Sequence, residues 1–124
     1  MAEYPEHHQT FVINSGDVVV DGSDYAAWDQ IWPPASGMAA VLPLFVGLGN
    51  HEDRGTAQSD AFIYGYFEFP SGASGSPDEK WFSFDYGDVH VTAIPLYDDD
   101  AYDSGPMHDW LVGDLGGAAA DDLT

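Results

Sequence analysis

Four consecutive residues whose side chains carry oxygen or nitrogen lone pairs directly follow the apolar run "VLPLFVGLG": Asn50, His51, Glu52 and Asp53. A turn needs only one or two such residues, whereas a binding site needs several. Upstream, a second apolar stretch ends in "SGD", with Asp17 last. A carboxylate and a side-chain amide offer hard oxygen ligands to a cation, and an imidazole can transfer a proton or contact a phosphate. These residue types predict a hydrolase that uses two metal ions.

Strands must position both groups for this chemistry to work. Residues 10–14 and 42–49 have the length and apolar character of strands, and residues 23–32 between them favour a helix. Strand, helix, strand is typical of a right-handed crossover between parallel strands. Asp17 and Asn50 would then follow the carboxyl ends of neighbouring strands, where open α/β sheets place their ligands. The glycine before each of them lets the backbone turn sharply.

The helix expected at residues 23–32 has a clear beginning and end. Ser23 or Asp24 can cap its first turn, and Pro33 and Pro34 are expected to stop it. Its apolar face would consist of Tyr25, Trp28, Ile31 and Trp32. A second short helical turn is expected within residues 36–43.

The second half of the chain differs in character. Residues 61–70 are rich in aromatic side chains and partly alternate, and residues 71–79 form a Gly/Ser/Pro loop. Residues 80–96 alternate on both sides of "YGD", which predicts a hairpin turning near Tyr86 to Asp88. Residues 104–115 favour a helix that begins at Pro106, with an apolar stripe on one side. That stripe consists of Met107, Trp110, Leu111 and Leu115. The expected fold class is α/β.

Composition limits the class of protein. The chain has 124 residues, the length of one domain, and 44% of them are apolar, which argues against disorder. It holds 22 acidic residues against one lysine, Lys80, and one arginine, Arg54, so its formal net charge is -20. Such a surface repels nucleic acid and anionic membranes. Its acidic surface is typical of halophilic proteins, because salt screens the self-repulsion.

Other classes of site and location are limited by what the sequence lacks. The chain contains no cysteine, so disulfides and thiolate metal sites are excluded. No signal peptide is visible at the start, and no apolar run approaches the length of a membrane span. We therefore expect a soluble protein, and its compartment is not indicated.

The order "GD" and then "GNHE" across a helix resembles two signature blocks of the calcineurin-like metallophosphoesterases. The stretch "NSGDVVVDGSDYAAWDQIWPPASGMAAVLPLFVGLGNHE" is similar to the purple-acid-phosphatase-like branch in particular. Downstream, "WFSFDYGDVHVTAI" and "SGPMHDWLVGDL" are similar to the hairpin and helix that follow in that branch. The resemblance runs from about Phe11 to Leu115. It implies a partial calcineurin-like fold, with mixed β-sheet layers flanked by helices.

By this resemblance, Asp17 would bridge two metal ions and Asn50 would bind the second through its amide oxygen. His51 would contact the phosphate or protonate the leaving alkoxide. Glu52 would hold His51 or a loop amide in place. The ions would be two of iron, zinc or manganese, and the substrate a small phosphate ester. His90 is expected to have no metal role, because the corresponding hairpin histidine of the family has none.

The remaining metal-ligand blocks of the family do not occur in this sequence. Residues 1–9 hold His7 and His8 but no Asp-x-His block, and the chain contains no Gly-His pair. We therefore expect a single domain, residues 1–124, that is an internal piece of a longer one. The isolated chain should be inactive or very weak, and flanking segments or an oligomer would complete the site.

Alternatives of a different class stay open. Asp17 can be a plain turn residue, and Asn50 and His51 can belong to an ordinary surface loop. The acidic run Asp98–Asp100 lacks the ligand pattern of a calcium loop and is expected to be solvated. The whole chain would then be a non-catalytic acidic α/β fragment or binding module that keeps the fold without the activity.

Overall fold

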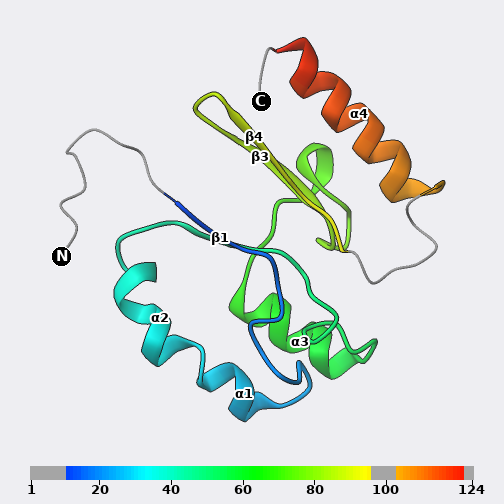
Figure 1. The fold of residues 1–124 in the computed structure, drawn as a ribbon. Coiled ribbons are helices and arrows are strands. Elements are labelled where there is room, and N and C mark those ends of the chain that lie inside the picture. Colours follow the sequence, from blue (N-terminus) through cyan, green and yellow to red (C-terminus); the bar gives the residue numbers. More distant parts are fainter. Residues whose placement is uncertain (1–10, 96–102, 122–124) are drawn as a thin grey trace.

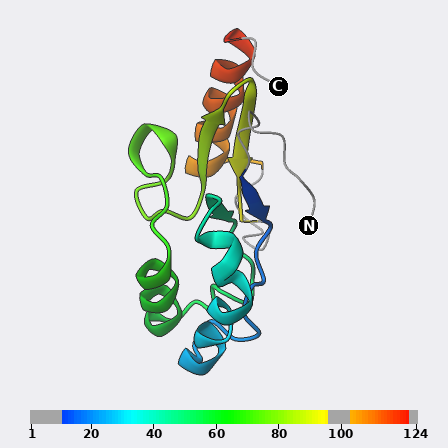
Figure 2. The same cartoon turned by 90° about the vertical axis from the view of Figure 1, so that its left-hand side faces the viewer.

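The computed structural model describes residues 11–95 and 103–121. His7 and His8 lie outside these residues, as does the acidic run Asp98–Asp100 that is expected to be solvated. Two views at right angles show helices α1, α2 and α3 gathered at one end of the molecule (Figures 1 and 2). The β3–β4 hairpin and helix α4 form the other end, and strand β1 lies between the two ends.

Two parallel strands form the first sheet. β1 (Val12–Asn14) pairs with β2 (Leu44–Val46), and Ile13 lies opposite Phe45. The predicted parallel pair is therefore confirmed, although both strands are shorter than their apolar runs. The connection between them contains the helices α1 (Tyr25–Asp29) and α2 (Trp32–Ala39).

The helical connection begins as predicted but ends differently. The Asp24 carboxylate accepts a hydrogen bond from the Ala26 amide at 2.9 Å and caps α1. The prediction that Pro33 and Pro34 stop this helix is wrong, because α1 has already ended at Asp29 and both prolines lie in the first turn of α2. A proline is tolerated there because the first-turn amides have no partner within the helix. The expected second helical turn is the end of α2.

Helix α3 (Ala57–Tyr66) occupies the aromatic segment that follows the polar loop. A capping box starts it, in which the Thr56 side chain accepts from the Ser59 amide and the Ser59 hydroxyl accepts from the Thr56 amide. α3 packs on α1 through the rings of Trp28 and Tyr66, stacked 5.3 Å apart. The partial alternation of residues 61–70 concealed this helix.

The predicted hairpin is confirmed. β3 (Phe82–Tyr86) and β4 (Val89–Ala93) pair antiparallel, and Gly87 takes a left-handed conformation with φ 64° in the turn. A short 3₁₀ turn, η1 (Gly72–Ser74), precedes the hairpin. Stacking of Phe45 on Phe84, with ring centroids 3.9 Å apart, joins the hairpin to the parallel pair.

Helix α4 (Pro106–Ala120) begins directly after Gly105, as predicted, and runs alongside the hairpin (Figure 1). Met107 is buried, but Leu115 is 50% exposed, so the predicted apolar stripe is only partly covered. Within residues 11–95 and 103–121, no helix combines the length and apolar character needed to cross a membrane.

The α/β class is confirmed, as two small sheets with four α-helices in the described part of the chain. A buried hydrophobic cluster joins the loops after β1 and β2 to α1, α3 and β3. Its members are Val19, Trp28, Leu48, Ile63, Phe69 and Phe82. Val19 and Leu48 belong to the two polar loops, so the hydrophobic core supports those loops directly.

Candidate functional site

The loops that follow β1 and β2 lie against each other at the carboxyl ends of the parallel strands. Gly16 has φ 102°, and a Cβ atom there would approach the Gly49 amide nitrogen to 2.6 Å. A Cβ atom on Gly49 would approach the Asp17 amide nitrogen to 2.5 Å. Neither position has room for a side chain, so both glycines are needed for this contact between the loops.

A buried carboxylate joins the two loops. Glu52 has no exposed surface. Its Oε2 accepts from the Asp17 amide at 2.7 Å and the Gly49 amide at 2.9 Å, and Oε1 accepts from the Val19 amide at 3.0 Å. Hydrogen bonds to a charged group contribute about 1.5–3 kcal/mol each. The structure therefore places Glu52 on loop amides, one of the two positions expected for it.

Asp17 sits in a conformation that few residues adopt. Its φ is 55°, in the left-handed region where Asp and Asn are the usual non-glycine residues. The bond from its amide to Glu52 holds this conformation, and its Oδ1 accepts from the His51 amide at 3.1 Å. The Asp17 carboxylate is exposed and has a fixed orientation relative to the second loop.

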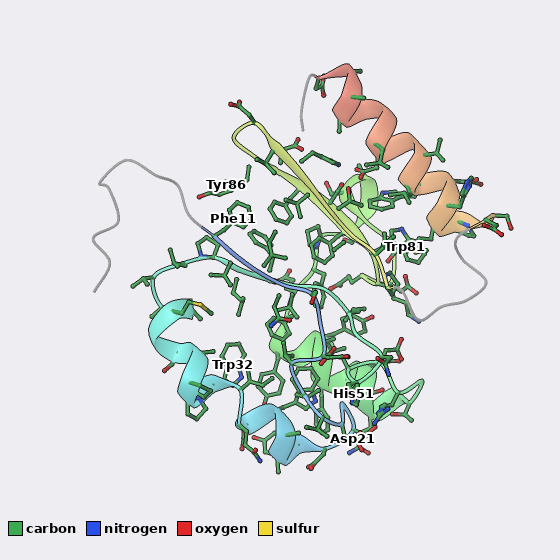
Figure 3. All side chains as sticks on the ribbon, viewed as in Figure 1. Phe11, Asp21, Trp32, His51, Trp81 and Tyr86 are labelled. Carbon is green, nitrogen blue, oxygen red and sulfur yellow. The ribbon has the colours of Figure 1, made fainter. Side chains whose placement is uncertain are left out.

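His51 is oriented by the first loop. Its Nδ1 lies 2.6 Å from the Val20 carbonyl oxygen. A carbonyl can only accept, so Nδ1 must carry the proton in this bond. The neutral ring then has its lone pair on Nε2. Figure 3 shows His51 close to Asp21, at the end of the molecule that contains α1 and α3.

Asp17 and Asn50 line the same cavity, which has a volume of about 650 Å³. Its polar end lies where β1 and β2 end, and β4 supplies another wall. Apolar side chains there include Ile13, Leu48, Val91 and Ile94. The structure thus brings together the two predicted metal ligands, whereas His51 and Glu52 are not among the residues that line this cavity.

The donor set is incomplete for a metal centre. Asp17 and Asn50 supply hard oxygen donors of the kind that a divalent or trivalent cation accepts. Among the residues that the structure describes, no group of three or more His, Asp or Glu side chains is placed to hold an ion. These residues alone therefore do not fit a complete two-metal site.

Both basic side chains of the chain contact the acidic surroundings of the second loop. Arg54 Nε lies 3.6 Å from an oxygen of Asp21, and Lys80 Nζ lies 3.7 Å from an oxygen of Asp53. Nearby, burial and then surrounding carboxylates raise the pKa of Tyr64 to about 12. Those carboxylates are Asp60, Asp78, Asp53 and Glu79. The local field therefore favours cations over anions.

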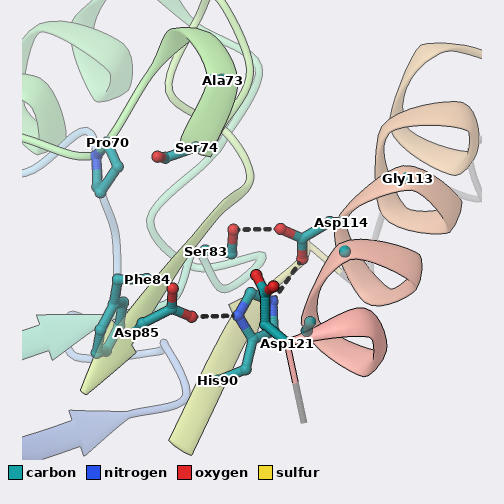
Figure 4. A pocket seen from close by; sticks show the side chains of 12 residues that line it. Pro70, Ala73, Ser74, Ser83, Phe84, Asp85, His90, Gly113, Asp114 and Asp121 are labelled. Atoms are coloured by element: carbon teal, nitrogen blue, oxygen red, sulfur yellow. Dashed lines mark hydrogen bonds and ion pairs between the residues drawn. The ribbon is translucent and has the colours of Figure 1, made fainter. Parts of the chain in front are cut away.

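A second polar cluster, which the sequence did not reveal, joins the hairpin to α4. His90 Nδ1 lies 2.6 Å from an oxygen of Asp85, and its Nε2 lies 3.0 Å from an oxygen of Asp114 (Figure 4). Asp114 also accepts from the hydroxyls of Ser83 and Thr92. Because carboxylates only accept, both ring nitrogens of His90 donate, as in an imidazolium. A ring with both nitrogens engaged cannot act as a base.

The pKa values of His90 and Asp114 shift in opposite directions. Hydrogen bonds to Asp85 and Asp114 raise the pKa of His90 above its ordinary 6.5, against the effect of burial. Burial acts to raise the pKa of Asp114, but bonds from Ser83, His90 and Thr92 outweigh it and hold the pKa below its ordinary 3.8. The adjoining cavity, about 490 Å³, is also lined by Asp121 and Phe84. We assign this cluster to docking of α4.

Comparison with known proteins finds one relevant similarity. Over 91 residues, 71% of this chain, the sequence is 33% identical to purple acid phosphatase 15 of Arabidopsis thaliana. The matched stretch spans 17% of that phosphatase, about one sixth of its length. No protein-family model matches the chain, and no solved structure matches it. The similarity supports a relationship at the level of phosphoesterase-type hydrolases.

Proposed function

We propose that this chain is part of a metal-dependent phosphoric-ester hydrolase of the calcineurin-like metallophosphoesterases, in their purple-acid-phosphatase-like branch. One observation carries the proposal. The "GD" and "GNHE" loops converge at the ends of two parallel strands, so that Asp17 and Asn50 line one cavity. The similarity to a purple acid phosphatase supports the same assignment.

In this proposal Asp17 is the central ligand. Its Oδ1 already accepts from the His51 amide at 3.1 Å, which restricts how the carboxylate can turn. No hydrogen bond within the described residues engages its Oδ2, which is therefore available to a cation. Asn50 would add its amide oxygen from the second loop. Glu52 acts indirectly: both of its carboxylate oxygens accept hydrogen bonds from loop amides, which holds the two loops in place.

His51 is the proton donor to the leaving group. With Nδ1–H bonded to the Val20 carbonyl, the reacting atom is Nε2. In the protonated ring, Nε2–H donates to the ester oxygen, and the proton passes to that oxygen as its bond to phosphorus breaks. Water adds to phosphorus from the opposite side. A bound pair of cations would activate that water and neutralise phosphoryl charge.

The missing ligands must come from residues outside those described. Two oxygen donors leave most of a cation's coordination unfilled. We propose that flanking segments of a longer chain, or a second chain, complete the site. The site would hold two metal ions, which are iron, zinc or manganese, and the substrate is a small phosphate ester.

Titration with Mn²⁺ in molar KCl tests the ligand assignment. Manganese is paramagnetic and broadens NMR signals of nearby nuclei, so it should broaden the Asn50 side-chain amide while sparing that of Gln58 on α3. Asp17→Asn should weaken binding about tenfold or more, because it removes the charged ligand. Asp78→Asn, which removes the same charge from an exposed loop, is the matched control. If the two substitutions weaken Mn²⁺ binding equally, Asp17 binds the ion no more specifically than an exposed surface carboxylate does.

Hydrolysis of a chromogenic phosphate ester tests the catalytic assignment. We expect very low turnover for residues 1–124 and substantial turnover when the remaining blocks are present. In the active form, Asp17→Asn and His51→Ala should each lower the rate by about 10²-fold or more. Strong turnover by the short chain that Asp17→Asn leaves unchanged would contradict both the site and its incompleteness.

A non-catalytic acidic module is the second candidate. The observation that favours it is the lack of a three-ligand group within residues 11–95 and 103–121. Under this alternative, Mn²⁺ would bind Asp17→Asn and the unaltered chain equally well. The metal titration therefore separates the two functions without requiring activity.

We further propose that the protein is adapted to high salt. A formal charge of -20 with two basic side chains makes folding depend on screening or on bound cations. Both basic side chains already pair with carboxylates. The remaining acidic groups repel one another unless salt is present.

A further inference from the structure

The orientation of His51 depends on a short segment, Val20–Gly22, that has almost no buried side chain of its own. Val20 is 79% exposed, and Asp21 is exposed as well. Yet the Val20 carbonyl holds the imidazole at Nδ1, 2.6 Å away, and the Gly22 amide donates to the His51 carbonyl at 2.7 Å. The segment therefore holds both the ring and the backbone of His51.

Gly22 lies directly against the second loop. A Cβ atom there would collide with the carbonyl oxygen of Glu52 and approach its Cα to 2.9 Å. The backbones of the two loops are thus in contact at this point, with no space for a side chain between them. Any displacement of Gly22 is passed to the backbone of His51 and Glu52.

Two anchors hold the segment at its ends. On one side, the Val19 amide donates to the buried Glu52 carboxylate. On the other, the indole Nε1 of Trp28 donates to the Gly22 carbonyl at 2.9 Å. Trp28 has no exposed surface, so this bond is shielded from water. Arg54 contacts the Val20 carbonyl only at 3.5 Å from an exposed position, which makes it the weaker support.

We propose that Trp28 is a positioning residue for His51 and acts through Gly22 and the Val20 carbonyl. This inference rests on the proposed function, because it assigns His51 Nε2 as the proton-transfer atom. The indole N–H fixes the Gly22 carbonyl, Gly22 fixes the turn, and the turn presents the Val20 carbonyl to Nδ1–H. The ring is thereby held in the tautomer that leaves Nε2 for the substrate.

Nitrogen-15 NMR of the imidazole rings in molar KCl tests the proposal directly. The unaltered chain should show His51 as the Nδ1–H tautomer, with the signal assigned by its loss in His51→Gln. Trp28→Phe keeps most of the stacked ring and removes the N–H. We expect a substantial fraction of the Nε2–H tautomer of His51 in this variant, together with faster exchange of the Gly22 amide proton.

Phe69→Leu is the matched control. Phe69 is a buried aromatic residue of the same core cluster, so its truncation also loosens the core, but no hydrogen bond joins its side chain to the Val20–Gly22 segment. This variant should retain the tautomer of the unaltered chain. If Trp28→Phe does not fold, 3-benzothienylalanine at position 28 keeps the size of the indole without the N–H and replaces it in the test.

The outcomes separate this inference from the proposed function. A folded Trp28 variant whose His51 keeps the Nδ1–H tautomer overturns the inference, as does a Phe69→Leu variant with the same change as Trp28→Phe. Loss of the tautomer in the Trp28 variant alone supports it. Absence of phosphatase activity in every form of the protein would overturn the proposed function and leave the tautomer result intact.

Discussion

Two junctions in this molecule are each built on one carboxylate that accepts three hydrogen bonds. At the first, Glu52 accepts from the backbone amides of Asp17, Val19 and Gly49 and joins the two loops. At the second, Asp114 accepts from the side chains of Ser83, His90 and Thr92 and joins α4 to the hairpin. The acceptors are alike, and the donors are of different kinds.

The difference in donors gives the two junctions different properties. Backbone amides do not titrate, and binding three of them fixes the path of the chain itself. Side-chain donors do not constrain the path of the backbone, and they fix only how α4 lies on the hairpin. One of them, His90, is titratable, and its bonds to Asp85 and Asp114 raise its pKa. The first junction suits a site that needs rigid geometry, and the second is a pH-sensitive attachment.

Breaking the first junction should give the largest effect. Glu52→Gln replaces one of the two acceptor oxygens with an NH2 group, which is itself a donor and would face backbone N–H donors at a fully buried position. We expect a loss of about 3–5 kcal/mol in the free energy of unfolding, measured with urea in molar KCl. Glu68→Gln makes the same chemical change at an exposed position and should cost little. Similar losses for both would show that the amide bonds matter less than the geometry indicates.

Salt should stabilise the whole fold, but it should affect the two junctions to different extents. From low to molar KCl we expect the melting temperature to rise by roughly 10 °C or more, because screening relieves the repulsion among acidic groups. The fully buried Glu52 junction should be nearly indifferent to salt, while the pair of His90 with exposed Asp85 should weaken. A flat or falling melting temperature would remove the salt-adapted interpretation.

Breaking the second junction should cost less. Asp114→Asn keeps an acceptor for one hydroxyl but loses the charge that His90 contacts. We expect a loss of about 1–2 kcal/mol, with faster amide exchange confined to α4. Asp109→Asn, on the exposed face of the same helix, is the control. Exchange that accelerates equally in α1 would contradict the assignment of this cluster to α4 alone.

The smallest expected effect concerns pH. Because the pKa of His90 is raised above 6.5, its contribution to stability is complete below pH 6.5 and is lost as pH rises through the raised value. The pKa of Asp114 lies below 3.8, so its contribution is complete above pH 3.8 and is lost as pH falls through the lowered value. The junction should be strongest between these limits.

The His90→Gln substitution tests this pH dependence, because it removes the group whose deprotonation lowers stability as pH rises. The melting temperature of the unaltered chain should fall by a few degrees as pH rises through the raised pKa of His90, and that of the variant should fall less. His108→Gln, at a half-exposed histidine that lies 3.3 Å from a carboxylate oxygen of Asp109, should keep the profile of the unaltered chain. Identical profiles for all three proteins would mean that His90 does not titrate in the expected range.

Features encoded in short stretches could be predicted from the sequence. The apolar runs and the intervening helix indicated the parallel pair, "YGD" indicated the hairpin, and Gly105–Pro106 marked the start of α4. The placement of Asp17 and Asn50 on one cavity follows from the same local pattern, because parallel strands end at the same edge.

Features that depend on distant partners could not be predicted. Glu52 bonds to residues more than thirty positions away, and His90 meets Asp114 across 24 positions. Nothing in a short window distinguishes these carboxylates from the other acidic residues of the chain. Helix α3 was missed for a different reason, since its sequence is aromatic and partly alternating. The available signal was the capping pair Thr56 and Ser59, a serine variant of the usual box.

The left-handed conformation of Asp17 has a consequence at the level of codons. Few residues tolerate φ 55°, and the ones that do so most readily are glycine, asparagine and aspartate. A single nucleotide change converts an aspartate codon to either of the other two. The carboxylate at this position can therefore disappear in one mutational step while the backbone keeps its shape. In the proposed function, one base change is therefore enough to remove this metal ligand while the local backbone is kept.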